Sequence, residues 1–325
     1  MTPAMAMVAR GETGFTAYDP AFRDVLGDTP RLHHVVDVDA HEGPVYVAAE
    51  DALYFTTKPC LGKVHIKRLQ LDGTSFPRRP SDVSVVEADT VAANGMTAGP
   101  EGSLLVCEQG SMTRRARISR VEPRTGRTTT VVTAWRHLPF SSPNDVVTHP
   151  DGSVWFTDPS YGWLQGFRPP PAVGDFVYRY DPATDVVDVV DDSFDKPNGI
   201  AFSPDHRTLY VTDSGANQEP GSYHHDRPHR VVAFDLTADQ RHLTNRRLLA
   251  VVAPGFPDGI TVDDRGRVYV SSFSGVQVLS PEGDLIGQID VPGAVNYTFG
   301  GPHRRLLLIT SDTAVWAAVL DPHGA

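Results

Sequence analysis

Several features that would point to particular protein classes are missing from this sequence. Its 325 residues include only two cysteines, Cys60 and Cys107, which are too few for a disulfide framework and lack metal-ligand spacing. No window approaches the roughly 18 consecutive apolar residues that a membrane-spanning helix needs, and the N-terminal stretch MTPAMAMVARGETGF lacks the apolar centre of a signal peptide. We therefore expect a cytoplasmic protein whose two thiols are free and buried.

Positive charge is also scarce. The chain has 29 lysines and arginines against 40 aspartates and glutamates, which gives a formal net charge of −11. Nucleic acids and anionic membranes would repel such a chain on average, so neither is expected as a partner. The residues do not indicate an oligomeric state. With 40% hydrophobic residues, the chain has enough apolar material for a full core.

What the sequence does contain is an internal repeat of about 50 residues. Each copy has a short apolar strand, a turn of the Pro-Asp-Gly type and a second strand rich in β-branched and aromatic residues. Proline presets φ at the first corner of such a turn, and glycine adopts the positive φ that the reversal needs. Four clear copies are GMTAGPEGSLLVCEQG from Gly95, DVVTHPDGSVWFTDPS from Asp145, GIAFSPDHRTLYVTDSG from Gly199 and GITVDDRGRVYVSSFSG from Gly259.

Two weaker copies flank these four, EGPVYVAAEDALYFTT from Glu42 and FGGPHRRLLLITSDTAVWAAV from Phe299. Further strand candidates between the copies bring each repeat to about four strands. This pattern predicts an all-β protein, a single six-bladed β-propeller domain over residues 1–325. We expect the N-terminal strands, around residues 15–38, to close the ring by pairing with the last blade after Ala314.

A polar residue stands just before the first strand in five of the six copies. These residues are Glu42, Asn94, Asn144, Asn198 and Asp258, and the corresponding position in the sixth copy is Gly300. Taken alone, an Asn-Gly or Asp-Gly pair is typical of a two-residue hairpin turn. The turn of each copy comes some five residues later, however, so we interpret the pairs as the start of the innermost strands, where side chains from several blades converge.

Such a convergence predicts a metal site on the propeller axis. Two carboxylates and two or three amides, with no lysine or arginine at the equivalent positions, would repel one another unless a cation lay between them. The ligands are all oxygens, which favours Ca²⁺, Mg²⁺ or Mn²⁺ over Zn²⁺.

Three segments in order carry a family resemblance: SSPNDVVTHPDGSVWFTDPSYG, KPNGIAFSPDHRTLYVTDSG and FPDGITVDDRGRVYVSSFSGVQVLSPEGDLIG. From about His41 to the C-terminus the chain resembles the gluconolactonase/senescence-marker-protein (regucalcin-like) family. The resemblance implies that Glu42, Asn144, Asn198 and Asp258 bind one divalent cation, with Ca²⁺ expected first and Mg²⁺, Mn²⁺, Fe²⁺ or Zn²⁺ as alternatives. It also implies that Asp258 is the catalytic group that transfers protons.

The expected function is hydrolysis of a sugar lactone or related cyclic ester, a small-molecule substrate. Asn94, Gln109 and Tyr161 are candidate substrate contacts. Gln109 replaces a histidine of many bacterial relatives, and no glutamate near Tyr161 matches the one that contacts sugar in animal relatives. The alternatives are a phosphotriesterase-like hydrolase on the same metal site and a non-catalytic scaffold with a structural ion.

An insertion over residues 216–230 contains His224, His225 and His229. These histidines could form a second metal site. No carboxylate or cysteine has regular ligand spacing with them, so we interpret the segment as a solvated loop that covers the channel mouth and shapes specificity.

Overall fold

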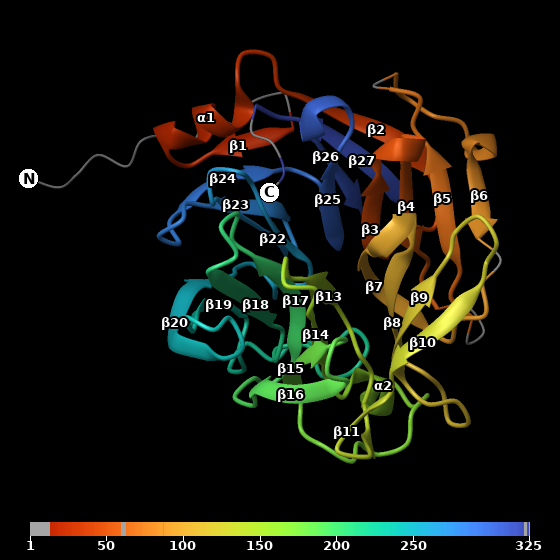
Figure 1. The fold of residues 1–325 in the computed structure, drawn as a ribbon. Coiled ribbons are helices and arrows are strands. Elements are labelled where there is room, and N and C mark those ends of the chain that lie inside the picture. Colours follow the sequence, from red (N-terminus) through yellow and green to blue (C-terminus); the bar gives the residue numbers. More distant parts are fainter. Residues whose placement is uncertain (1–13, 60–62, 74, 87, 322–323, 325) are drawn as a thin grey trace, which may run out of the picture.

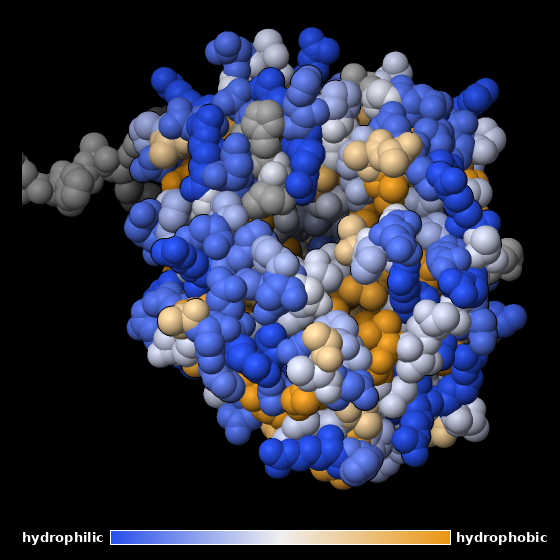
Figure 2. All heavy atoms as spheres, in the orientation of Figure 1, coloured by the Kyte–Doolittle hydropathy of each residue, from blue (hydrophilic) through white to orange (hydrophobic). Residues whose placement is uncertain are grey.

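The fold is described from a computed structural model, which covers residues 14–59, 63–73, 75–86, 88–321 and 324. Cys60 and most of the N-terminal stretch considered above lie outside these residues. Six antiparallel sheets are arranged radially around a common centre (Figure 1), and the surface is hollowed at that centre (Figure 2). The chain is therefore an all-β six-bladed propeller, as the repeat predicts.

The first three sheets each contain four strands in chain order from the centre outward. They consist of β3 (Glu42–Val47), β4 (Ala52–Thr56), β5 (Ile66–Gln70) and β6 (Val83–Val86); β7 (Ala93–Ala98), β8 (Leu104–Glu108), β9 (Arg117–Val121) and β10 (Thr128–Val132); and β13 (Val146–Thr148), β14 (Val154–Asp158), β15 (Phe176–Asp181) and β16 (Val186–Asp191). Two short strands, β11 (Ala134–Trp135) and β12 (Leu138–Pro139), form a separate hairpin.

The last three sheets close the ring. They consist of β17 (Pro197–Phe202), β18 (Thr208–Asp213), β19 (Arg230–Leu236) and β20 (Leu243–Val251); β21 (Ile260–Val262), β22 (Val268–Ser272), β23 (Gly275–Leu279) and β24 (Leu285–Ile289); and β25 (Asn296–Gly300), β26 (Leu306–Thr310) and β27 (Ala314–Val319). The N-terminal strands separate: β2 (Arg31–Asp37) pairs with β27, whereas β1 (Phe15–Ala17) pairs with β24 of the fifth sheet. Contacts between β25 and β3 join the sixth sheet to the first.

Within the described residues, helical structure is confined to single turns between strands. The α-helices are α1 (Arg23–Leu26) and α2 (Tyr161–Leu164), and the 3-10 turns are η1 (Pro20–Phe22), η2 (Ala48–Glu50), η3 (Pro80–Asp82), η4 (Pro100–Gly102) and η5 (Pro302–Arg304). Throughout the described part of the chain, no helix has the length and apolar character that crossing a bilayer requires.

The sixth repeat begins earlier than the sequence predicts. Its first strand is β25, which starts at Asn296, and the turn η5 separates it from β26. The prediction placed the residue before this strand at Gly300, which is instead the last residue of β25. The polar residue at the start of the innermost strand of the sixth blade is therefore Asn296.

The core lies between neighbouring sheets, where apolar side chains of one blade face those of the next. Between the second and third sheets, for example, Cys107, Phe140, Phe156 and Tyr178 are almost fully buried. The Phe140 ring lies 5.1 Å from both the Phe156 and the Tyr178 ring centroids. Cys107 is a free thiol, and burial raises its pKa well above the ordinary value. This packing holds the six innermost strands around the centre.

Candidate functional site

The six innermost strands bring one polar residue each to the same end of the central channel. These residues, which we call the ring residues, are Glu42, Asn94, Asn144, Asn198, Asp258 and Asn296. Each lies within two residues of the start of its strand. Contacts join each innermost strand to the next around the ring. The convergence expected from the repeats is therefore present in the structure.

The glycine after a ring residue is needed because the neighbouring blade comes very close. A Cβ atom at Gly95 would lie 2.4 Å from the carbonyl oxygen of Asn144, and one at Gly199 would lie 2.5 Å from that of Asp258. The amide of Gly95 donates to Asn144 O at 2.8 Å, and that of Gly199 donates to Asp258 O at 3.2 Å. The Asn-Gly pairs therefore mark close approach between blades, and the hairpin-turn interpretation does not apply to them.

Threonines of the second strands fix the same carbonyl groups. Thr157 Oγ1 donates to Asn198 O at 2.6 Å, and Thr212 Oγ1 donates to Asp258 O at 2.9 Å. Both threonines are fully buried. The third and fourth blades thus position the ring residue of the next blade through a hydrogen bond shielded from water.

Glu42 and Asp258 form a pair of facing carboxyl groups. Asp258 makes side-chain hydrogen bonds with Glu42 and Asn198. Burial, followed by the charge of Glu42, raises the pKa of Asp258 well above its ordinary value. Asn296 Nδ2 donates to Glu42 Oε2 at 2.8 Å, which orients that carboxylate. Two acidic groups this close favour either a shared proton or a cation between them.

Two amide oxygens of the ring have unused hydrogen-bonding capacity. The Oδ1 atoms of Asn94 and Asn144 are buried, and neither has a hydrogen-bond partner among the described residues. A buried carbonyl oxygen without a partner is costly unless an ion or a ligand satisfies it. Beside two carboxylates, such oxygens fit a hard divalent cation.

The acidic and imidazole groups alone do not form a metal site. Over the residues that the structure describes, no cluster of three or more His, Cys, Asp or Glu side chains could hold an ion. An ion at the ring would therefore need amide oxygens as well as Glu42 and Asp258. The other four ring residues, Asn94, Asn144, Asn198 and Asn296, all carry an amide oxygen.

Two further titratable groups border the ring. His41 Nδ1 lies 2.7 Å from Asp312 Oδ1. Burial disfavours the charged imidazole, but the hydrogen bond that it donates to Asp312 and the charge of Glu42 together raise the pKa of His41. Burial and the charge of Glu42 also raise the pKa of Asp145 to about 8. Its carboxylate accepts the backbone amides of Val146 and Ile200 at 2.9 and 3.2 Å.

The predicted substrate contacts lie at the same end of the channel. Tyr161, at the start of α2, is buried, and its hydroxyl reaches Ser214 O at 3.4 Å and also bonds Asn198. Gln109 is buried directly after the end of β8. The register pairs Ala93, at the start of β7, with Glu108, at the end of β8. Gln109 therefore lies beside Ala92, whose carbonyl oxygen accepts its amide at 3.0 Å, two residues before Asn94.

The histidines of the insertion do not converge. His224 Nε2 lies 3.4 Å from Glu219 Oε2, whereas His229 Nδ1 bonds Val252 O at 2.7 Å. The loop is closed by backbone hydrogen bonds of 2.8 Å from Ala216 N to Pro228 O and from His224 N to Ala216 O. The segment therefore has its own structure, and its histidines form no second metal site in the described part of the chain.

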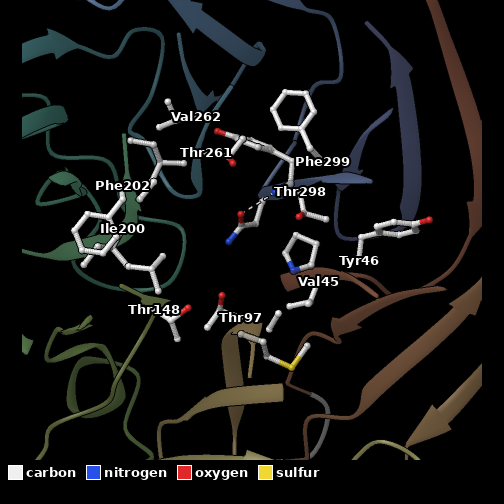
Figure 3. Close-up of a pocket in the computed structure, with 18 of the residues that line it drawn as sticks. Val45, Tyr46, Thr97, Thr148, Ile200, Phe202, Thr261, Val262, Thr298 and Phe299 are labelled. Carbon is white, nitrogen blue, oxygen red and sulfur yellow. Dashed lines mark hydrogen bonds between the residues drawn. The ribbon is translucent and has the colours of Figure 1, made fainter. Parts of the chain in front are cut away.

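A cavity of about 580 Å³ occupies the opposite end of the channel. It is lined by the later residues of the innermost strands, and it reaches Asp145 and Asn296 at its inner end. Figure 3 shows these strands contributing side chains around the opening, among them Val45, Thr97, Thr148, Ile200, Thr261 and Thr298. This cavity therefore lies behind the ring residues, and the candidate chemistry lies at the other mouth.

Sequence reasoning missed three residues of this neighbourhood: His41, Asp145 and Asn296. Asn296 could have been found by placing the sixth turn at Pro302–Arg304 and counting back to the start of the preceding strand. Asp145 was noted only as the partner of Asn144. The contact between His41 and Asp312 joins the two ends of the ring, and no sequence spacing reveals it.

Comparison with known proteins adds to this geometry. A family model described as SMP-30/Gluconolactonase/LRE-like region matches residues 40–313. The chain is 28% identical over 305 residues to the lactonohydrolase oryL of Aspergillus oryzae, covering 87% of this chain and 69% of that protein. It is 29% identical over 311 residues to the gluconolactonase of Zymomonas mobilis, covering 92% and 84%.

A solved structure agrees with these matches. The structure of a gluconolactonase from Xanthomonas campestris superimposes with a TM-score of 0.78 at 31% identity, and the alignment covers 97% of each chain.

Proposed function

Because the chain belongs to the SMP-30/Gluconolactonase/LRE-like family, we propose that it is a metal-dependent lactonase that opens a small cyclic ester. The names of its relatives, a lactonohydrolase and two gluconolactonases, support this reaction class. The observation that carries the proposal is the facing pair Glu42 and Asp258, which lies next to buried amide oxygens at one mouth of the channel.

The proposed cofactor is one divalent cation, held by Glu42, Asn144, Asn198 and Asp258. Ca²⁺ is favoured because the ligands are carboxylate and amide oxygens, which are typical of hard cations. When bound, such an ion polarises the lactone carbonyl and stabilises the negative charge that develops on its oxygen.

Asp258 is the proposed proton carrier. Its buried carboxylate is held beside Glu42 by the hydrogen bond with Asn198, and a carboxylate positioned in this way can serve as a general base. It accepts a proton from the water that adds to the lactone carbonyl carbon, and it holds this proton on Oδ. It then gives the proton to the ring oxygen as the carbon–oxygen bond breaks, so that the product is an open hydroxy acid.

The neighbours of Asp258 position it for this task. Asn198 hydrogen-bonds the Asp258 side chain, while Thr212 fixes its backbone carbonyl. Asn94, Gln109 and Tyr161 are the proposed substrate contacts. Asn94 carries a buried amide oxygen without a partner in the described chain, which can accept a hydroxyl of the substrate.

The proposal is tested by measuring acid release from a panel of lactones with wild-type protein and Asp258→Asn. Loss of a positioned base should lower kcat by about 10²- to 10⁴-fold. Asp205→Asn is the matched control, because Asp205 is an exposed turn residue after β17, at the opposite end of the innermost strand.

Equal turnover by wild type and Asp258→Asn would contradict the proposal. Turnover of a phosphotriester but of no lactone would assign the same site to another reaction. Tight metal binding without turnover of either substrate would indicate a structural ion.

A further inference from the structure

Four large apolar side chains are exposed in loops at the candidate mouth. They are Met112, Trp163, Tyr223 and Phe273, with exposed fractions of 61%, 48%, 44% and 49%. Each follows the second strand of its sheet, in the second, third, fourth and fifth blades respectively. We call these four side chains the apolar rim.

The strand register places the apolar rim at the same end of the channel as the ring residues. Second strands run antiparallel to the innermost strands, so each second strand ends where its neighbour begins. In the fourth sheet, for instance, Pro197 at the start of β17 pairs with Asp213 at the end of β18. The segments that follow the second strands must therefore surround the mouth that holds Asn198 and Asp258.

The other large apolar side chains that are exposed in the described residues differ from the apolar rim in type and in position. Apart from Tyr18, which follows β1, they are aliphatic and lie on outer strands or on the β11–β12 hairpin: Val85, Leu138, Val186, Leu248, Val251 and Leu285. Three aromatic rings and a methionine thus gather in the loops around the mouth. Aromatic and methionine side chains are enriched at binding surfaces. Aromatic rings offer much contact area for little ordering entropy, and methionine adapts its shape to the bound group.

Part of the apolar rim is held in place by an aromatic cluster beside Asp258. The rings of Phe256 and Phe273 lie 5.1 Å apart, and Tyr223 lies 5.6 Å from Phe273. Phe256 is two residues before Asp258 in the chain. Gly255 allows this packing, because a Cβ atom there would lie 2.3 Å from the Phe273 ring. The backbone amide of Phe273 also donates to Pro254 O at 3.1 Å.

A second set of aromatic side chains connects the apolar rim with the ring residues. It lies on the third blade, whereas the cluster around Phe273 lies on the far side of Asn198. Helix α2 carries both Trp163, which is exposed, and Tyr161, which is buried and hydrogen-bonded to Asn198. The part of a bound molecule that points from the ring residues toward solvent would therefore lie between two aromatic surfaces. These are Tyr161 with Trp163 on one side and the cluster of Tyr223, Phe256 and Phe273 on the other. A polyhydroxylated sugar lactone offers little apolar surface to such walls.

From this arrangement we propose that the substrate is a lactone with an apolar substituent, aryl or alkyl, that lies against the apolar rim. This inference rests on the proposed lactonase function and specifies its substrate class. Burying the exposed faces of Tyr223 and Phe273 against an apolar group removes apolar surface from water on both partners, whereas a hydroxylated group would lose hydrogen bonds to water.

The test compares γ-phenyl-γ-butyrolactone with γ-butyrolactone and with glucono-1,5-lactone, in kcat and KM. Wild type should have the highest kcat/KM for the phenyl lactone. Tyr223→Ser and Phe273→Ser should each raise KM for the phenyl lactone about tenfold and change that for γ-butyrolactone less than about twofold. Phe273→Tyr should keep the preference, because it keeps the ring.

Leu248→Ser is the matched control, an equally exposed apolar residue on the outer strand β20. Thermal unfolding of each variant verifies that it folds. A wild-type preference for glucono-1,5-lactone, or equal KM changes for both butyrolactones, would overturn the inference and leave the lactonase function standing. Absence of turnover with every lactone would overturn the proposed function and the inference together.

Discussion

Replacing Thr212 with valine should disturb the position of Asp258 without changing the volume of the core. Thr212 is fully buried; its hydroxyl donates to Asp258 O at 2.9 Å and accepts the amide of Gly199 at 2.8 Å. Valine has nearly the same shape but no hydroxyl. Because the Gly199 amide also lies 3.2 Å from Asp258 O, these two groups can still pair with each other. The expected loss is therefore the net contribution of about one buried hydrogen bond, roughly 0.5–1.5 kcal/mol.

Such a loss should lower the melting temperature by a few degrees, at about 2–4 °C per kcal/mol for domains of 150–250 residues. The fall in kcat should be larger than the small loss of stability alone would cause, because a shift of about 1 Å in a catalytic group can lower the rate about 100-fold. Thermal unfolding and kcat on the preferred lactone measure the two effects. Thr212→Ser is the control: it loses only a methyl group, about 0.8 kcal/mol, and keeps the hydroxyl. Equal kcat for the two variants would refute the positioning role of this hydroxyl.

Three further predictions follow from the same contacts. Removing the cation with a chelator should lower the melting temperature, because Glu42 and Asp258 then face each other alone; Ca²⁺ at 100 times its Kd should restore about 2.7 kcal/mol, and a melting temperature unaffected by either step would contradict this. Gly199→Ala should destabilise the protein by roughly 1–3 kcal/mol in chemical denaturation, because its Cβ would meet Asp258 O at 2.5 Å; unchanged stability would show that the blades can move apart. Asp151→Asn should lower the free energy of unfolding by about 1 kcal/mol at pH 7 and by progressively less below about pH 4. Burial raises the pKa of Asp151, but hydrogen bonds from Ser153 and the other neighbours outweigh this effect and lower the pKa. The stabilisation is therefore lost as the carboxylate protonates. Melting temperatures of wild type and Asp151→Asn from pH 7 to 3 test this, and a constant difference would contradict it.

The turns made most of the fold predictable from the sequence. Pro150, Asp151 and Gly152 form the turn between β13 and β14, where Gly152 has a φ of 89° and Asp151 accepts the amide of Ser153 at 2.8 Å. Such a turn depends only on adjacent residues, so the sequence alone predicts it. The number of repeats that contain this turn then predicts the number of blades. In the sixth repeat the turn instead contains His303 and Arg304, both with positive φ, and the strand boundaries were misplaced there.

The convergence of the ring residues was also predictable, because it follows from position in the repeat. The reason for the glycines was not. Gly95 and Gly199 have no positive φ, and only the distance to the neighbouring blade shows why a side chain is excluded there. That distance depends on how blades pack, which no single repeat encodes.

Contacts between distant segments lay beyond sequence reasoning altogether. The pair His41 and Asp312, and the hydrogen bond from Asn296 to Glu42, join the first and last blades. They exist only because the ring closes. The aromatic cluster of Tyr223, Phe256 and Phe273 likewise depends on an insertion in one blade that folds against the next.

We propose above that Glu42, Asn144, Asn198 and Asp258 hold a divalent cation that lactone opening requires. The most direct measurement is kcat on a lactone for metal-stripped wild type and Glu42→Gln, each titrated with Ca²⁺, Mg²⁺, Mn²⁺ or Zn²⁺ and analysed for bound metal. Glu42→Gln removes one of the two carboxylates, while its remaining amide oxygen can still accept the hydrogen bond from Asn296. The account predicts no turnover by stripped wild type, recovery with about one ion per chain, and weaker metal binding with lower kcat for Glu42→Gln. Full turnover by the stripped protein, or unchanged metal binding by Glu42→Gln, would contradict it.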